Sequence, residues 1–222
     1  MAIPPGAMEL DGFLDWVCSA GFPRGVRASL INGCLRLEPV GDHLFTHNSL
    51  KGAVFAALRE YGRRTKLGRA YTDGAIYAHR PDGPANEPDA TFLLYESLTS
   101  GRVRVGERRE GAGGLPIVEG AADLVAECVS DSSVPKDTVE LRAAYFSAGV
   151  REYWLLDGRG DDLEFALLTR TEESADWAEA EVDADGYRLS PVLGRRVKIA
   201  RETDPLGDAE WDVLLDEPAA AE

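Results

Sequence analysis

Two acidic residues lie in segments that the sequence predicts as buried strands. Asp89 stands at the entrance of the apolar segment "DATFLL", and Glu127 lies inside the nearly continuous apolar run "AADLVAECV". A buried carboxylate is costly unless it is paired, hydrogen-bonded or bound to a metal. If the two strands are neighbours, the two acids meet at one end of the sheet and repel each other unless a cation lies between them.

Magnesium suits such a pair, because it accepts one or two carboxylates and keeps several waters for a phosphate substrate. The competing interpretation is structural: Asp89 follows Pro88 in a turn, and Glu127 pairs with an arginine. Spacing alone leaves both interpretations open, and the structural one is the more common.

Two further patterns could carry chemistry. His43 and His47 have a spacing seen among zinc ligands, with Cys34 upstream, but no second tight ligand pair accompanies them, so we expect capping or surface positions. Basic residues gather in 59–69 and 102–109, where they could form a phosphate-facing rim. Solvated charge at helix and loop ends is the favoured interpretation of both clusters.

The elements that must position the acids follow the apolar periodicity. Residues 121–130 predict a buried strand, and residues 137–148 predict a helix that begins with the capping-box pair Asp137 and Glu140. Residues 152–157 predict the next strand. A strand, a helix and a strand in this order predict an α/β core.

Hairpins predicted at both ends of the chain indicate a mixed sheet. Asn32-Gly33 is a favoured dipeptide for a two-residue hairpin turn, and short strands are predicted after Asp157, at 162–169, 177–182, 187–189 and 195–200. We therefore expect an α/β fold with a mixed central sheet flanked by helices and a β-rich C-terminal arm. The expected organisation of residues 1–222 is a single domain, with a core at about 10–157, the arm at 158–200 and a frayed tail at 215–222.

Net charge and cysteine content indicate which partners and which cellular compartment to expect. The 222-residue chain carries a net charge of −15, which disfavours broad non-specific nucleic-acid binding unless a local basic patch overrides it. Its three cysteines are dispersed and imply no disulfide framework. The N-terminus lacks a signal-peptide layout, and no apolar run reaches the length of a membrane span. We expect a soluble cytoplasmic protein with no membrane partner.

Three segments, in their order along the chain, resemble the Uma-type putative restriction endonucleases of the PD-(D/E)XK nuclease superfamily. They are "EPDATFLL", "ADLVAECVSDSS" and, most specifically, "AAYFSAGVREYWLLD". The segments "INGCLRLEP" and "YRLSPVLGRRVKI" also match in kind and order, so the resemblance covers roughly residues 10–200. The resemblance implies a restriction endonuclease-like fold and a phosphodiesterase that acts on DNA, in which Asp89 and Glu127 hold Mg²⁺ or Mn²⁺.

The resemblance also implies a lysine that orients the attacking water or stabilises charge on the phosphate. In the basic pattern of the superfamily this lysine lies two residues after the glutamate, where this chain has Val129. In the Uma-type group it lies on the following helix, where this chain has Leu141. Arg142 is one helix step of about 100° away and should face elsewhere. Lys136, at the entry to the helix, is our candidate substitute, and Lys51 on an earlier helix is another.

A second departure concerns the N-terminal hairpin, where the family usually has a glutamate directly after the glycine and this chain has Cys34. With Asp89, Glu127 and Lys136 as candidate catalytic residues, we predict a Mg²⁺-dependent endonuclease. The alternative is a non-catalytic descendant that binds a partner protein or nucleic acid. The missing lysine and the net charge of −15 favour this alternative, and the β-rich arm is compatible with a homodimer.

Overall fold

The computed structural model describes residues 2–41, 43–80, 83–106, 116–171, 173 and 175–216. Its central sheet has six strands. In order across the sheet they are β12 (Ala178–Glu179), β11 (Glu164–Thr169), β10 (Glu152–Asp157), β9 (Leu124–Cys128), β6 (Ala90–Leu94) and β3 (Gly68–Thr72). Strands β9 and β10 are parallel and the other neighbouring pairs are antiparallel, so the sheet is mixed, as predicted.

Two further sheets accompany the central one. The second sheet contains, in order, β2 (Cys34–Pro39), β1 (Val26–Ile31), β5 (Ala85–Asn86), β4 (Ile76–Ala78), β8 (Ile117–Gly120) and β7 (Val103–Val105). The third is antiparallel and contains β13 (Arg188–Ser190), β14 (Arg195–Thr203) and β15 (Ala209–Asp216). Strands β1 and β2 form the predicted hairpin, and both residues of its Asn32-Gly33 turn have positive φ, as a type I′ turn requires.

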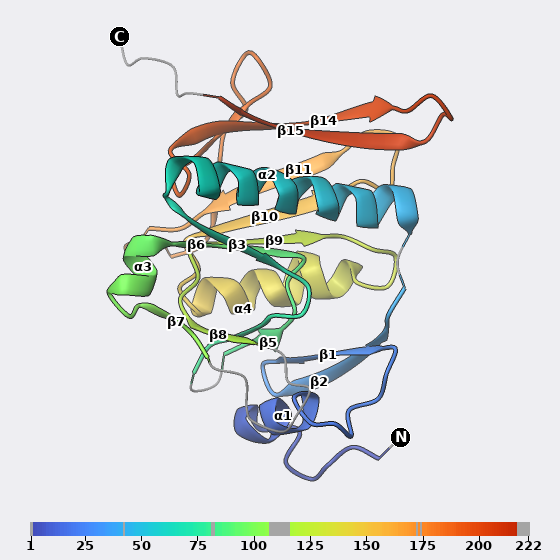
Figure 1. Ribbon diagram of the computed structural model, residues 1–222, viewed down its shortest axis with the longest axis vertical. Coiled ribbons are helices and arrows are strands. Elements are labelled where there is room, and N and C mark those ends of the chain that lie inside the picture. The colour runs from blue at the N-terminus through green and yellow to red at the C-terminus, as the bar shows by residue number, and fades with distance from the viewer. Residues whose placement is uncertain are drawn as a thin grey trace.

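Helices separate the sheets into layers (Figure 1). The helical segments are α1 (Leu10–Val17), the π-helical turn η1 (Leu44–Asn48), α2 (Ser49–Thr65), α3 (Tyr95–Thr99), the π-helical turn η2 (Lys136–Leu141) and α4 (Arg142–Ser147). In Figure 1, α2 lies between the third sheet and the central sheet, α4 lies between the central and second sheets, and α1 lies beyond the second sheet. No helix in the described part of the chain is both long and apolar enough to span a membrane.

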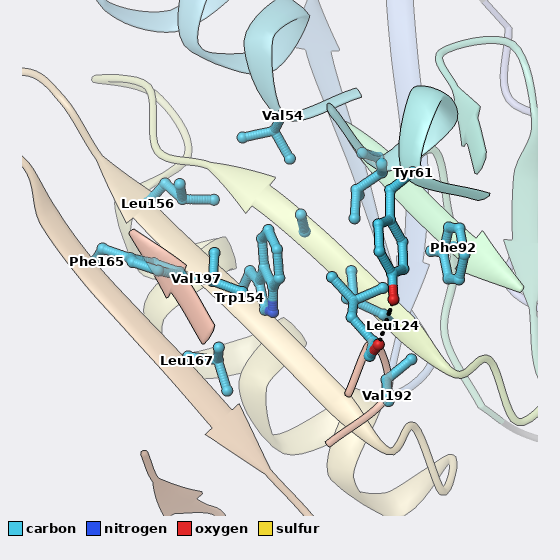
Figure 2. Close-up of a cluster of buried hydrophobic side chains, with 14 of the residues drawn as sticks. Val54, Tyr61, Phe92, Leu124, Trp154, Leu156, Phe165, Leu167, Val192 and Val197 are labelled. Atoms are coloured by element: carbon cyan, nitrogen blue, oxygen red, sulfur yellow. Dashed lines mark hydrogen bonds between the residues drawn. The ribbon is translucent and has the colours of Figure 1, made fainter. Parts of the chain in front are cut away.

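The core packs on both faces of the central sheet. On one face, Val54 and Tyr61 of α2 lie in one buried cluster with Trp154 of β10, and Val197 of β14 joins them from the third sheet (Figure 2). Tyr61 ends in a hydrogen bond from its hydroxyl to the carbonyl oxygen of Leu193, at 2.7 Å. This packing fixes α2 over the sheet, and with it the turn η1 that precedes the helix.

The other face of the sheet carries α4 and the π-helical turn η2. Leu141, Tyr145 and Val125 lie in one buried cluster there, with Tyr153 of β10 and Tyr77 of the second sheet. The rings of Tyr145 and Tyr153 meet edge to face, with centroids 5.2 Å apart. The crossover from β9 to β10 is therefore held rigidly against both sheets, and it presents its first turn, η2, toward the end of β9.

The structure differs from the sequence prediction at the second sheet and in the C-terminal arm. A separate six-stranded sheet was not predicted, because most of its strands are only two to four residues long and show no clear alternation. In the predicted arm, the strand expected at 162–169 is β11, which belongs to the central sheet. The third sheet is formed by β13 and β14, which were predicted, and by β15, which was not. In the predicted tail, Leu215 and Asp216 end β15, and the later residues lie outside the described residues.

Candidate functional site

Asp89 and Glu127 lie side by side at one end of the central sheet. Asp89 directly precedes β6, and Glu127 lies in β9, the antiparallel neighbour of β6. The backbone N–H of Asp89 faces Glu127 Oε2 at 3.4 Å, and the N–H of Cys128 donates to Asp89 Oδ2 at 2.8 Å. The two residues are only 6% and 3% exposed. Strand pairing therefore brings together two buried acids that are 38 residues apart in the sequence.

Asp89 is surrounded by groups that favour its ionised form. Lys51 Nζ, on the first turn of α2, lies 3.4 Å from Oδ1, and His47 Nε2, in η1, lies 3.5 Å from Oδ2. Burial opposes ionisation, but the hydrogen bond and charge of His47, with the charge of Lys51 and the N–H of Cys128, outweigh it and lower the pKa of Asp89. Asp89 is therefore a carboxylate at neutral pH.

Glu127 is held at one oxygen by two donors. The hydroxyl of Tyr145 donates to Oε1 at 2.5 Å, and Asn86 Nδ2 donates to the same oxygen at 3.1 Å. Burial, followed by the charges of Asp137 and Asp89, raises the pKa of Glu127 well above its ordinary value. The ionised form of Glu127 is thus destabilised by its acidic neighbours, and an added cation would relieve that repulsion.

A third acid, Asp137, was not predicted as a site residue. It lies inside η2, whose N-cap is Pro135, and is 1% exposed, so the predicted cap position of Asp137 is wrong. Burial raises the pKa of Asp137 to about 7, although the ammonium of Lys136 acts in the opposite direction. Its Oδ1 has no hydrogen-bond partner within the described residues. An acid at a helix start fits a cap equally well, so the sequence carried no signal that separated the two roles.

Lys136 brings an ammonium group to the same acids. Its Nζ lies 2.8 Å from Glu38 Oε2 and 3.6 Å from Asp137 Oδ1. Burial lowers the pKa of Lys136, but the charges of Asp137, Glu127 and Glu38 outweigh burial and raise it. Lys136 is therefore charged in the folded protein and partly balances the acids around it.

These groups enclose a cavity of about 20 Å³, which is room for one water-sized group. Its charged lining consists of Asp89, Glu127, Asp137, Lys136, Glu38 and Glu87, together with Arg27 of β1. A larger hollow of about 570 Å³ adjoins the cavity and shares Pro39, His47, Ser130 and Ser132 with it. The hollow gives the cavity a neighbouring space in which a larger molecule could lie.

The β1–β2 hairpin forms one wall of the cavity and is tied to η2 by ion pairs. Glu38 of β2 lies opposite Arg27 in the hairpin register, and both residues line the cavity. Besides the pair between Lys136 and Glu38, the guanidinium of Arg36 pairs with the carboxylate of Glu140. The hairpin thus supplies the site with an acid, but from position 38 and not from the position after the turn glycine.

The structure places two of the departures from the family pattern outside the cavity. Leu141, at the position where a lysine was expected, is completely buried in the apolar cluster around Tyr145. Cys34 is exposed at the hairpin turn and does not line the cavity. Lys51 contacts Asp89 but is paired with Asp73 at 2.8 Å, and only Lys136 of the two lysines lines the cavity.

The structure also places the two histidines and the two basic clusters. His43 is exposed, as predicted, but His47 is only 3% exposed and contacts Asp89, so a capping or surface position is wrong for it. The basic clusters do not contribute to the cavity lining within the described residues. Arg63 pairs with Glu60 on the surface of α2, and Arg108 and Arg109 lie outside the described residues.

The donor set fits a hard divalent cation. Within the described residues, no three Asp, Glu, His or Cys side chains are already grouped as a complete set of metal ligands. Mg²⁺, however, binds through one or two carboxylates and retains its waters. Asp89 and Glu127 supply such a pair, and Asp137, whose Oδ1 accepts no hydrogen bond and lies 3.6 Å from Lys136 Nζ, offers a third carboxylate on the same cavity. Buried acids that raise one another's pKa are stabilised by positive charge, so the residues present fit the ion.

Comparison with known proteins identifies the family of the chain. Residues 10–201 match the Uma2 family, which is described as "Putative restriction endonuclease". The chain belongs to this family, and the resemblance stated from the sequence is confirmed.

One similar solved structure is the crystal structure of a "putative nuclease belonging to DUF820" from Anabaena variabilis ATCC 29413. The TM-score is 0.53 and the sequence identity is 14%, over 75% of this chain and 82% of that chain. At this identity the likeness shows a shared nuclease-like fold and carries no residue roles. No curated protein matches the chain.

Proposed function

We propose that this protein is a metal-dependent endonuclease that hydrolyses phosphodiester bonds in DNA, with Asp89 and Glu127 holding Mg²⁺ or Mn²⁺. The observation that carries the proposal is the meeting of three buried acids, Asp89, Glu127 and Asp137, around a cavity that is also lined by Lys136. Membership of the Uma2 family supports the same reaction class.

The chemistry divides between the bound ion and the chain. A divalent cation, when bound, activates water as a nucleophile and neutralises charge on the phosphate. Asp89 binds as a preformed carboxylate, because His47 and Lys51 lower its pKa. Glu127 binds through a carboxylate that Tyr145 orients. Lys136 places a permanent positive charge beside the acids, where it can stabilise the negative charge that develops on the phosphate.

Lys136 can replace the lysine that the family has at position 141, because only the position of the ammonium group matters for this role. It begins η2, five residues before Leu141. The side chain of Leu141 faces the apolar cluster, whereas that of Lys136 lines the cavity. The ion pair with Glu38 holds the ammonium group near the hairpin, within the same lining.

The second candidate function is a binding module without catalysis. Two observations favour it: an apolar residue stands at the family's lysine position, and Lys136 is engaged with Glu38 at 2.8 Å. A protein of this kind would keep the fold and the acids but bind DNA or a partner protein without cutting. The two functions differ in a single readout, which is cleavage.

The decisive experiment is a cleavage assay on plasmid and single-stranded DNA, in Mg²⁺ or Mn²⁺ and in excess chelator. The proposal predicts cleavage that needs the metal and is reduced at least 100-fold by Glu127→Gln, a change that preserves the shape of the side chain. The absence of cleavage of either substrate in both metals would favour the binding module. Cleavage that persists in Glu127→Gln would assign the activity to other residues or to a contaminant.

A further inference from the structure

Three buried polar side chains form a closed triangle behind the metal-binding face of Glu127. Tyr145 of α4 donates to Glu127 Oε1 at 2.5 Å, and Asn86 of β5 donates to the same oxygen at 3.1 Å. Asn86 Nδ2 also lies 2.7 Å from the hydroxyl oxygen of Tyr145. The three residues come from the second sheet, the central sheet and the crossover helix, and all are at most 3% exposed.

The triangle gives the two oxygens of Glu127 different surroundings. Oε1 accepts from two donors, which occupy the directions in which a carboxylate oxygen accepts hydrogen bonds. Oε2 faces the backbone N–H of Asp89 at a long 3.4 Å, on the side where Glu127 and Asp89 line the cavity. Of the two oxygens, Oε2 is therefore the one available to a cation.

The ring of Tyr145 is itself fixed on both sides. It meets Tyr77 edge to face at 5.8 Å and Tyr153 at 5.2 Å, so its hydroxyl cannot swing away from Glu127 without disturbing the core. Residues that hydrogen-bond to a metal ligand orient it and tune its basicity, and their loss typically weakens metal binding about 10–100-fold. The triangle has the form of such a support.

We propose that Tyr145 and Asn86 are positioning residues that lock the Glu127 carboxylate so that Oε2 is presented, beside Asp89, to a divalent cation. The inference rests on the proposed function, because it concerns the same site. It adds that this site is built by the packing of α4 against both sheets, and that the crossover helix contributes to metal binding through the hydroxyl of Tyr145.

The test is a calorimetric titration of the full chain with Mn²⁺, comparing wild type with Tyr145→Phe. The matched control is Tyr61→Phe, which also removes a buried hydroxyl that donates at 2.7 Å, but to the carbonyl of Leu193 on the other face of the central sheet (Figure 2). We expect Tyr145→Phe to weaken Mn²⁺ binding at least 10-fold and Tyr61→Phe to change it less than twofold. Both variants should lose a similar part of their stability to urea, because each loses one buried hydrogen bond.

The outcomes separate this inference from the proposed function. Mn²⁺ binding that is abolished by Asp89→Ala but unchanged in Tyr145→Phe would overturn the positioning role and leave the metal site intact. An absence of Mn²⁺ binding to wild type at millimolar concentration would overturn the proposed function, and this inference with it. If Tyr145→Phe does not fold, Asn86→Ala provides the second variant, since it removes the other donor to Oε1; metal binding within twofold of wild type there would contradict the proposal.

Discussion

Buried acids at two places on the central sheet have different surroundings. Glu152, the first residue of β10, is completely buried; its Oε1 accepts from Trp154 Nε1 and Ser190 Oγ, both at 2.6 Å, and its Oε2 accepts from the N–H of Val192 at 3.1 Å. Burial raises the pKa of Glu152 to about 7 despite these hydrogen bonds. Glu152 is thus supplied with donors by the protein itself and ties the third sheet to the central one.

The acids of the cluster Asp89, Glu127 and Asp137 also have donors, but they additionally face one another. The pKa of Glu127 is raised by burial and then by the two other acids, so part of its destabilisation comes from like charge. All three acids line the same cavity. The comparison shows that a raised pKa does not by itself mark a functional acid. Glu152 and Glu127 both accept hydrogen bonds, but only Glu127 is also destabilised by neighbouring acids beside a cavity, where a cation would relieve the repulsion.

The largest expected effect tests the structural half of this comparison. Glu152→Ala should lower the free energy of unfolding by about 4 kcal/mol, because it leaves three buried donors without an acceptor. Urea denaturation measures this loss. Glu127→Gln, in metal-free protein, should leave stability unchanged or raise it, because it removes mutual repulsion while its amide oxygen can still accept from Tyr145. Equal losses in both variants would remove the distinction between the two places.

The stability of the protein should depend on pH through the protonation of Glu152. Its pKa rises from 4.5 in the unfolded chain to about 7 in the folded protein, so its stabilising contribution is complete below pH 4.5 and is lost as the pH rises through 7. The resulting fall in unfolding free energy is about 3 kcal/mol. Urea denaturation of wild type and Glu152→Gln at pH 5 and pH 8 measures it. A fall of the same size in the variant would assign the pH dependence to other groups, among which Asp137 titrates in the same direction.

Replacing Lys136, which lines the cavity, should affect DNA cleavage more than replacing Lys51, which does not. Lys136→Met should reduce DNA cleavage about 100-fold, because it removes the positive charge that lines the cavity. Its control is Lys51→Met, which removes the ammonium that is paired with Asp73 and does not line the cavity. We expect a smaller loss of cleavage from this change. Its cause would be indirect, because removing the charge of Lys51 raises the pKa of Asp89. If Lys51→Met abolished cleavage and Lys136→Met did not, the roles of the two lysines would be reversed.

The smallest effect concerns the hairpin. Cys34→Glu introduces the acid that the resemblance leads one to expect after the turn glycine, but position 34 is exposed and outside the cavity lining. Mn²⁺ affinity should therefore change less than twofold. Glu38→Gln, which alters the hairpin acid that does line the cavity, is the comparison variant and should change the affinity more. A clear gain of affinity in Cys34→Glu would show that the turn reaches the site.

The sequence singled out the two acids that lie in or directly before an apolar, fully buried strand. Glu127 is visible as one charge in an apolar run, and Asp89 as an acid at the start of the next such run along the sheet. Their proximity follows from the pairing of β6 with β9, and their roles stay predictions. Asp137 and Glu38 were missed for a physical reason: an acid at a helix start also fits a cap, and an acid in a half-exposed strand also fits the surface.

The fold shows the same division. The strand, helix and strand between 121 and 157 could be predicted because burial on both faces leaves an apolar signature in β9 and β10. The second sheet could not, because β4, β5, β7 and β8 contribute only two to four residues each and are held by partners distant in sequence. Asn86, which supports Glu127, lies on one of these short strands. Its contribution to the site therefore depends on tertiary pairing and not on local pattern.

The most direct test of the account is a Mn²⁺ titration by calorimetry of wild type, Asp89→Ala and Glu152→Gln. We predict that wild type binds Mn²⁺, that Asp89→Ala weakens binding at least 100-fold, and that Glu152→Gln binds within twofold of wild type, because Asp89 belongs to the shared cluster and Glu152 does not. Absence of binding to wild type at millimolar Mn²⁺, or equal binding by Asp89→Ala, would contradict the assignment of a metal site to these acids.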